Sequence, residues 1–187
     1  MSRCASLRAA ERQAPATVDD GAGAADEAVF RRVLGNVPTS VAIVTGQDGD
    51  GHFGLVVGSL VSISLRPSLV GMFIDNRSRT LNRLLGCERL CINVLAAKDA
   101  PFCRDFCGNR AGRFLSEDWI HQDGEGPRFN RALAWIAGSL DRSMAIGDHH
   151  LIVIAPDLLA ENPACATSHP LVFFRGAFAS QAAPAQH

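Results

Sequence analysis

The stretch GLVVGSLVSISLRPSLV, residues 54–70, decides the fold of this chain. Its apolar and β-branched residues predict two long strands, Gly54–Leu65 and Leu69–Ile74. The Arg66-Pro67 pair between them predicts a turn, because proline removes a backbone donor and fixes φ. We therefore expect the two strands to form a hairpin.

Small residues and hydroxyls interrupt this apolar stretch and admit two interpretations. Glycine weakens the interior of a strand, so Gly58 marks either a bend at a barrel corner or a close approach of a ligand to the backbone. Ser59, Ser62 and Ser64 either face solvent or supply hydroxyls to that ligand. A flat aromatic ring with a polar edge would suit such a surface.

The rest of the chain alternates short apolar runs with turn signals. Helices are predicted at Asp26–Val37, Ser78–Leu85 and Asp99–Gly108, strands at Val41–Thr45, Leu90–Leu95, Leu133–Asp141, His150–Ala155 and Leu171–Phe174, and a loop at residues 109–130. Many short strands with a few small helices predict a mainly β fold, a β-barrel with helical additions.

Length and composition indicate one globular domain. The 187 residues are 47% hydrophobic and 20% charged with a net charge of −1, which indicates no general attraction to nucleic acid or to an anionic membrane. The apolar runs are too short to span a bilayer, and no signal peptide is recognisable, so we expect a cytoplasmic protein. We expect a disordered tail at residues 1–25, the domain at 26–180 and a second tail at 181–187.

The six cysteines predict small buried thiols rather than a metal centre. They are Cys4, Cys87, Cys91, Cys103, Cys107 and Cys165. No CxxC pair occurs, and a zinc site would need tighter pairs or histidines in register. In a reducing compartment disulfides are rare, so we predict neither disulfides nor metal ligands.

The segment Asp75-Asn76-Arg77-Ser78-Arg79-Thr80 is a candidate phosphate site. Ser78 is a good N-cap for the predicted helix, and unpaired N–H groups at a helix start attract anions. Arg77, Arg79 and Arg83 add positive charge. A capped surface helix with solvated arginines explains the same residues equally well.

Two further segments could contact a charged ligand. Gly147-Asp148-His149-His150 leads into a hydrophobic strand, where His149 either binds a charged ligand or only pairs with Asp148. The two histidines alternate sides of a strand, which argues against a shared metal. Phe173-Phe174-Arg175-Gly176 places an arginine that either contacts an anion or lies at the surface. The chain contains no Walker A, GxSxG, HExxH or GxGxxG motif.

Taken in order, these segments resemble the flavin reductase-like family over about residues 28–178, and the resemblance rests on the ordered set. Its pieces are Phe30-Arg31-Arg32-Val33-Leu34-Gly35, residues 38–45, residues 54–70, Ser78-Arg79-Thr80, residues 91–95, Arg113-Phe114, residues 132–135, Gly147-Asp148-His149 and residues 170–176.

The resemblance implies an FMN-binding split β-barrel, usually a homodimer, that transfers hydride from NADH or NADPH to FMN or FAD. Such reductases commonly release reduced flavin to a separate monooxygenase. The resemblance assigns flavin contacts to Val56, Val57, Gly58, Ser59, Val61 and Ser62, phosphate contacts to Ser78, Arg79 and Thr80, the nicotinamide side to His149 as the catalytic residue, and further ligand-side positions to Arg175 and Thr39.

Two residues depart from the family pattern. Family members often have threonine at the position of Val56 and a polar residue at that of Gly58, so two side-chain partners of the ring are missing here. Backbone amides remain available in their place.

Two other functions remain open at this stage. The chain could keep its FMN and act directly on an organic substrate, with substrate contacts in the loop at residues 109–130. It could also be a non-catalytic split barrel that holds flavin or haem, with His149 or His150 as an iron ligand.

Overall fold

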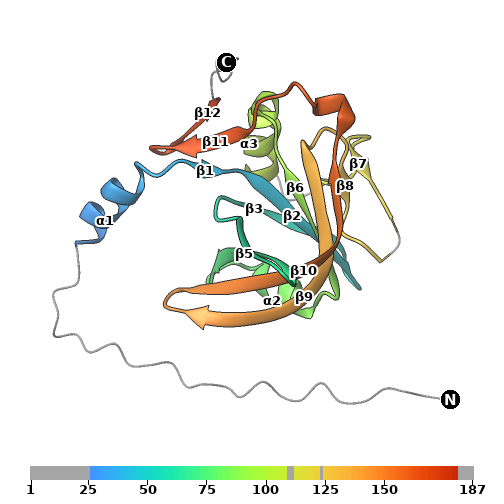
Figure 1. Ribbon diagram of the computed structural model, residues 1–187, viewed down its shortest axis with the longest axis horizontal. Helices are drawn as coiled ribbons and strands as arrows, with labels where there is room; N and C mark the ends of the chain where they lie inside the picture. Colours follow the sequence, from blue (N-terminus) through green and yellow to red (C-terminus); the bar gives the residue numbers. More distant parts are fainter. Residues whose placement is uncertain (1–25, 109–111, 123, 181–187) are drawn as a thin grey trace.

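The computed structural model describes residues 26–108, 112–122 and 124–180 (Figure 1). The tails predicted at residues 1–25 and 181–187 lie outside the described residues. The helices are α1 (Glu27–Leu34), α2 (Leu81–Gly86) and α3 (Ala100–Gly108), and short 3-10 turns cover Ala97–Asp99 and Pro163–Cys165. The strands are β1 (Thr39–Ser40), β2 (Ala42–Asp48), β3 (Gly51–Val57), β4 (Val61–Leu65), β5 (Ser68–Asp75), β6 (Arg89–Val94), β7 (Trp119–Ile120), β8 (Arg128–Phe129), β9 (Ala134–Ile146), β10 (His149–Glu161), β11 (Leu171–Phe174) and β12 (Ala177–Ser180).

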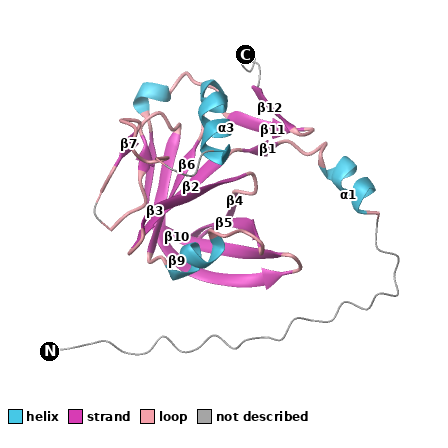
Figure 2. Cartoon of the chain, turned by 180° about the vertical axis from the view of Figure 1, so that it is seen from behind, coloured by secondary structure: helices cyan, strands magenta, loops and turns pink. Residues whose placement is uncertain are grey.

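Seven antiparallel strands form the main sheet, in the order β3-β2-β6-β9-β10-β5-β4. Its two edge strands, β3 and β4, are neighbours in the chain and are joined by only three residues, 58–60. The short connection brings the two edges of the sheet near each other, so the sheet curls into a barrel. The helices lie outside it (Figure 2). The prediction of a mainly β barrel with small helices is therefore confirmed.

The predicted strand Gly54–Leu65 is wrong as a single element, because the chain leaves one edge of the sheet at Gly58 and joins the other edge at Val61. The Ser59 hydroxyl donates to the Phe73 carbonyl (3.1 Å) and accepts from the Phe73 N–H (2.9 Å). The Ser59 side chain thus satisfies the N–H and the carbonyl of Phe73 in β5, which would otherwise pair with a neighbouring strand. The hairpin itself is confirmed, since β4 pairs with β5.

Other element boundaries also differ from the prediction. Ser78 does not cap a helix: α2 begins at Leu81 with Thr80 at its N-cap, and the Ser78 hydroxyl accepts instead from the Thr80 N–H at 3.3 Å. The helix α1 ends at Leu34 rather than Val37. A helix start and a serine turn use the same local hydrogen bonds, so sequence alone separates them poorly.

The β9–β10 hairpin is longer than predicted, because each strand has 13 residues. β9 pairs with β6 through its first half, and β10 pairs with β5 through its own first half. β5 therefore flanks the hairpin up to its tip, whereas the second half of β9 extends beyond β6 and pairs only with β10. The predicted loop at 109–130 contains the small β7–β8 pair, and β12 was not predicted at all.

Two apolar clusters fill the interior. One lies between the sheet and α2, around Met72, Ile74 and Leu84, and the other joins α3 to β7 and β8, around Phe106 and Phe129. The described cysteines Cys87, Cys91, Cys103 and Cys165 are buried as predicted, whereas Cys107, in the last turn of α3, is exposed. Cys4 lies outside the described residues.

None of the described helices has the length and hydropathy needed to cross a membrane.

Candidate functional site

A cavity of about 750 Å³ opens where β3 meets the turn between β5 and α2. The end of α3 and the segment that follows it form the opposite wall. This volume lies in the range of small-molecule and cofactor sites. The described lining residues are His52, Phe53, Gly54, Leu55, Val56, Arg77, Ser78, Arg79, Thr80, Arg83, Phe106, Cys107, Gly112, Arg113, Phe114 and Leu115.

The described lining carries four arginines and no carboxylate, although the chain as a whole is slightly acidic. Arg77 pairs with Asp75 at 2.7 Å, and Arg83 pairs with Asp48 at 2.5 Å. Hydrogen bonds from these two guanidinium groups hold the pKa values of Asp75 and Asp48 below their usual range, so both carboxylates stay ionised. Their charge offsets that of their two arginines.

Arg79 is different, because its guanidinium makes no hydrogen bond or ion pair with any residue that the structure describes. It is exposed at the mouth of the cavity, between the half-buried hydroxyl residues Ser78 and Thr80. An uncompensated guanidinium flanked by two hydroxyls is suited to a phosphate group. These residues fit the phosphate of a flavin nucleotide.

Gly54, at the floor of the cavity, is closely packed by neighbouring residues. A Cβ on Gly54 would lie 3.2 Å from the ring of Phe106, 3.3 Å from that of Phe114 and 2.7 Å from the Val44 carbonyl oxygen. A larger residue would therefore fill the space between β3 and α3. The glycine thus allows Phe106 and Phe114 to pack closely against β3.

The residues assigned to the flavin ring occupy the break between β3 and β4. Val56 lines the cavity, whereas the side chain of Val57 is buried in the core and offers only its backbone. Gly58 lies against Thr39, since a Cβ on Gly58 would be 3.0 Å from the threonine hydroxyl. Val61 and Ser62 are exposed on β4.

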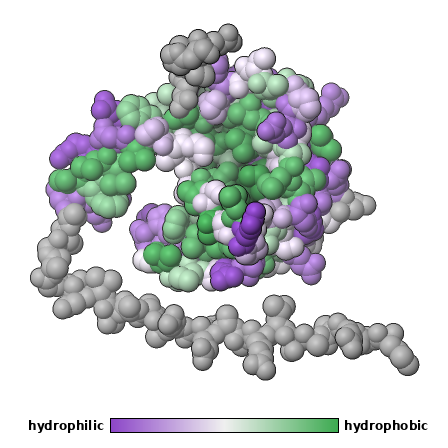
Figure 3. All heavy atoms as spheres, viewed as in Figure 1, coloured by the Kyte–Doolittle hydropathy of each residue, from purple (hydrophilic) through white to green (hydrophobic). Residues whose placement is uncertain are grey.

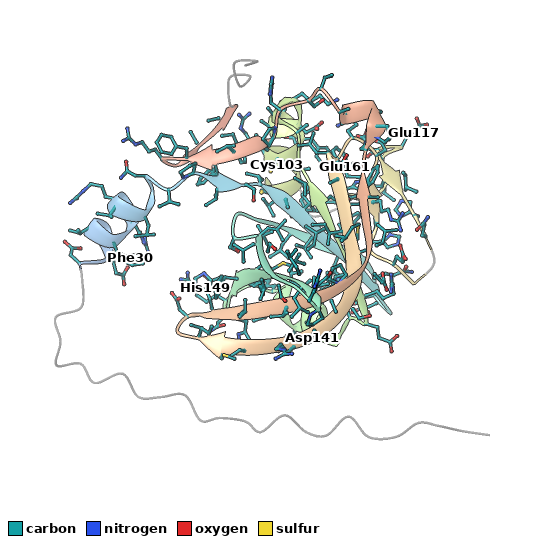
Figure 4. The ribbon with its side chains drawn as sticks, viewed as in Figure 1. Phe30, Cys103, Glu117, Asp141, His149 and Glu161 are labelled. Atoms are coloured by element: carbon teal, nitrogen blue, oxygen red, sulfur yellow. The ribbon has the colours of Figure 1, made fainter. Side chains whose placement is uncertain are left out.

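His149 stands at the start of β10, beside the tip of the β9–β10 hairpin (Figure 4). Its Nδ1 atom lies 2.6 Å from a carboxylate oxygen of Asp148, which leaves Nε2 available. The backbone N–H of Asn76 donates to the Asp148 carbonyl, and the Asn76 side chain contacts both the Gly147 carbonyl and the His150 ring. The turn that carries His149 is thus fastened to the segment that leads into Ser78.

Arg175 lies away from the cavity. It has a positive φ of 48° in the β11–β12 turn, and its guanidinium donates to the Asn36 side chain at 2.7 Å. Neither Arg175 nor Thr39 nor His149 lines the cavity, whereas Val56, Ser78, Arg79 and Thr80 do. The structure thus brings together the phosphate residues and one end of the flavin stretch.

Several lining residues were not predicted as site residues. His52 lies four residues before Val56, which is twice the two-residue period of a strand, and this spacing is the one signal that could have placed it on the same face. Arg113 and Phe114 belong to the resemblance but were given no role. Phe106 and Cys107 reach the cavity only because α3 packs against β3, which no local pattern shows.

The fold and the arginine-lined cavity define a β-barrel protein with a site suited to an anionic ligand. Residues 34–182 match the flavin reductase like domain, so the chain belongs to the flavin reductase-like family, as the resemblance predicted.

Relatives agree with this assignment. The chain is 32% identical over 162 residues to a flavin reductase of Pseudomonas putida, a match that covers 86% of this chain and 93% of the relative. It is 30% identical over 151 residues to HsaB of Mycobacterium tuberculosis, the reductase subunit of a flavin-dependent monooxygenase, with 81% and 80% covered. The solved structure of Streptomyces globisporus SgcE6, an NADH:FAD oxidoreductase with NAD and FAD fragments, superposes with a TM-score of 0.78 at 26% identity, covering 86% and 96%.

Proposed function

We propose that this chain is an NAD(P)H-dependent flavin reductase that takes FMN or FAD and uses NADH or NADPH as hydride donor. The observation that carries the proposal is Arg79, which lies between Ser78 and Thr80 and has no partner among the described residues, in a cavity whose floor is the strand that ends at Val57. Relatives named for the same activity support it, among them an NADH:FMN oxidoreductase of Rhodococcus qingshengii at 28% identity.

The cofactors supply the redox chemistry, which is a hydride transfer from the nicotinamide to the flavin. The protein's contribution is to hold the two rings against each other. Arg79, Ser78 and Thr80 hold the phosphate, and the backbone at Val57 and Gly58 replaces the side chains that this chain lacks beside the ring. The transfer itself needs no acid or base from the protein.

We further propose that reduced flavin leaves this chain for a separate monooxygenase. The support comes from HsaB, named as a reductase subunit of such an enzyme. The relatives named as flavin reductases favour this function over two alternatives. One is a protein that retains its FMN and acts on an organic substrate, and the other is a protein that binds flavin or haem without catalysis. We propose that residues 26–180 form the reductase domain and that the protein acts in the cytoplasm.

The deciding experiment follows NADH and NADPH oxidation at 340 nm with and without added FMN or FAD. We expect oxidation that depends on free flavin and saturates with it. A protein that oxidises neither nucleotide with either flavin would contradict the proposal. The same assay ranks the two flavins and the two nicotinamide cofactors.

We also propose a homodimer. The helix α1 has no buried residue, and its apolar side chains Phe30, Val33 and Leu34 are 46–58% exposed. In Figure 3 apolar side chains gather on α1, the helix that Figure 1 shows apart from the barrel. The edge strand β4 adds exposed Val61, Ile63 and Leu65. Exposed apolar surface of this kind is typical of a face that another subunit covers.

The dimer predicts a molar mass of twice 19.9 kDa in light scattering after size exclusion. Phe30→Asp is expected to shift the protein to monomer, because the charge would enter the contact. Arg142→Asp, on an exposed stretch of β9, is the matched control and should leave the dimer intact. A monomeric parent protein at micromolar concentration would refute the dimer.

A further inference from the structure

We infer that the stacked pair of His52 and His121 is a pH-sensitive clasp, which holds one wall of the cavity closed at neutral pH and releases it in acid. This wall is the segment of residues 112–122, whose first four residues line the cavity. The His52 ring stacks on the His121 ring, with centroids 4.6 Å apart and planes inclined by 23°. The pair thus joins the end of the segment to β3, an edge strand of the barrel.

Hydrogen bonds within the segment make the wall follow His121. A carbonyl oxygen only accepts, so the Nε2 atom of His121 is the donor in its 3.2 Å contact with the Phe114 carbonyl. The indole N–H of Trp119 donates to the Arg113 carbonyl at 2.8 Å, and its ring lies 4.9 Å from that of Phe114. A protonated imidazole still donates from Nε2, so acid leaves these bonds intact. A force on the His121 ring therefore acts on the residues that line the cavity.

Protonation opposes the stacked arrangement. Burial, and then the neighbouring His121, lower the pKa of His52, because an imidazolium there would lose hydration and face a second cation. A histidine released to solvent regains its ordinary pKa of about 6.5. Below about this pH the open wall therefore binds more protons than the closed wall, so acid favours opening and neutral pH favours closure.

The charged groups around the pair do not neutralise this repulsion. They come from α2, β2, the β2–β3 turn, the segment itself and the stretch that leads into β8. Those that the structure describes are Arg83, Asp48, Asp50, Arg113, Glu125 and Arg128. Arg83 pairs with Asp48 at 2.5 Å, and Arg128 pairs with Glu125 at 2.7 Å, so both of these carboxylates already have a cation. Asp50 is exposed, and solvent screens its charge.

Opening of the wall changes what the cavity can hold. Arg113 and Phe114 would move away from a bound ligand together with the segment, so a flavin in the cavity is held less tightly in acid. This consequence rests on the proposed function. The opening itself is a property of the protein without ligand, so the two can be tested separately.

Trp119 reports the opening in the absence of any ligand. Its side chain is only 5% exposed, and the chain has two tryptophans, so Trp135→Phe serves as the parent background. We expect the emission of Trp119 to shift to the red between about pH 8 and about pH 5.5, on either side of the ordinary histidine pKa. The shift arises because the indole leaves the Arg113 carbonyl and meets water.

Three variants decide whether the clasp causes the shift. His52→Phe keeps a flat ring but cannot be protonated, so it is expected to abolish the red shift. His121→Phe removes the facing charge and leaves His52 half-buried, so it should retain a smaller shift. His169→Ala, an exposed histidine outside the cavity, is the matched control and should shift as the parent does. A shift of equal size in His52→Phe and the parent would overturn the clasp, whether other groups or unfolding of the barrel produced it.

The dissociation constant of FMN at the same two pH values tests the consequence for the ligand. Relative to its own value at the higher pH, the parent is expected to lose about three- to tenfold more affinity than His52→Phe. The comparison cancels protonation of the FMN phosphate itself, which occurs near pH 6 in both proteins. Equal losses in the two proteins would overturn control of flavin binding by the clasp. A protein that shows the Trp119 shift through His52 but oxidises no NAD(P)H keeps the clasp and loses the proposed function.

Discussion

Arg79→Ala is expected to raise the dissociation constant of FMN by about ten- to a hundredfold, as loss of a charged hydrogen-bonding partner of a phosphate does. Arg77 and Arg83 already have carboxylate partners, at 2.7 Å and 2.5 Å, whereas Arg79 has none among the described residues. Removing Arg79 therefore removes positive charge that no carboxylate among the described residues compensates. Quenching of flavin fluorescence on titration measures the effect.

Two variants make the result specific. Arg79→Lys keeps the charge but loses the fork of donors, so it should fall between the parent and alanine. Arg142→Ala removes an exposed arginine that pairs with Asp141 outside the cavity, and it should bind flavin as the parent does. Identical FMN titration curves for Arg79→Ala and the parent would show that the phosphate is held elsewhere. The structure gives no reason for Arg79→Ala to unfold the protein, because the side chain is exposed.

The strands that the sequence predicted well are those whose pairing agrees with their local pattern. Leu171–Phe174 has the predicted bounds, and Leu90–Leu95 differs from β6 by one residue at each end. Both are short runs of mostly apolar residues that include β-branched or aromatic side chains. The break after Val57 could not be predicted in the same way, because the Ser59 hydroxyl bonds to Phe73, which lies 14 residues further along.

The site residues also separate into those that local sequence could predict and those that it could not. Ser78, Arg79 and Thr80 are contiguous, so their chemistry can be read from a short segment, and Val56 follows from the resemblance. His52, Phe106 and Phe114 come from three separate segments that meet only through packing of α3 against β3. A single sequence gives no signal for that packing. The ring cluster and the length of the cavity were therefore accessible only from the structure.

His149→Ala is expected to raise the KM for NADH about tenfold while leaving the dissociation constant of FMN within about twofold, since one hydrogen bond to a charged group is worth roughly that much. We expect this effect because of where His149 lies. His149 pairs across the sheet with Asp75, and Asn76 ties its turn to the chain that leads into the phosphate residues. The imidazole is thus held beside the flavin site without lining the cavity, where a second nucleotide would approach.

Steady-state kinetics at saturating flavin, with a flavin titration beside it, separates the two effects. Asp148→Asn keeps His149 but weakens the 2.6 Å contact that orients its ring, so its KM should rise less than that of His149→Ala. If His149→Ala weakens FMN and NADH equally, the histidine stabilises the whole turn rather than the nicotinamide. Unchanged KM and kcat would remove His149 from the site and leave orientation of the nicotinamide to the residues around the β3–β4 break.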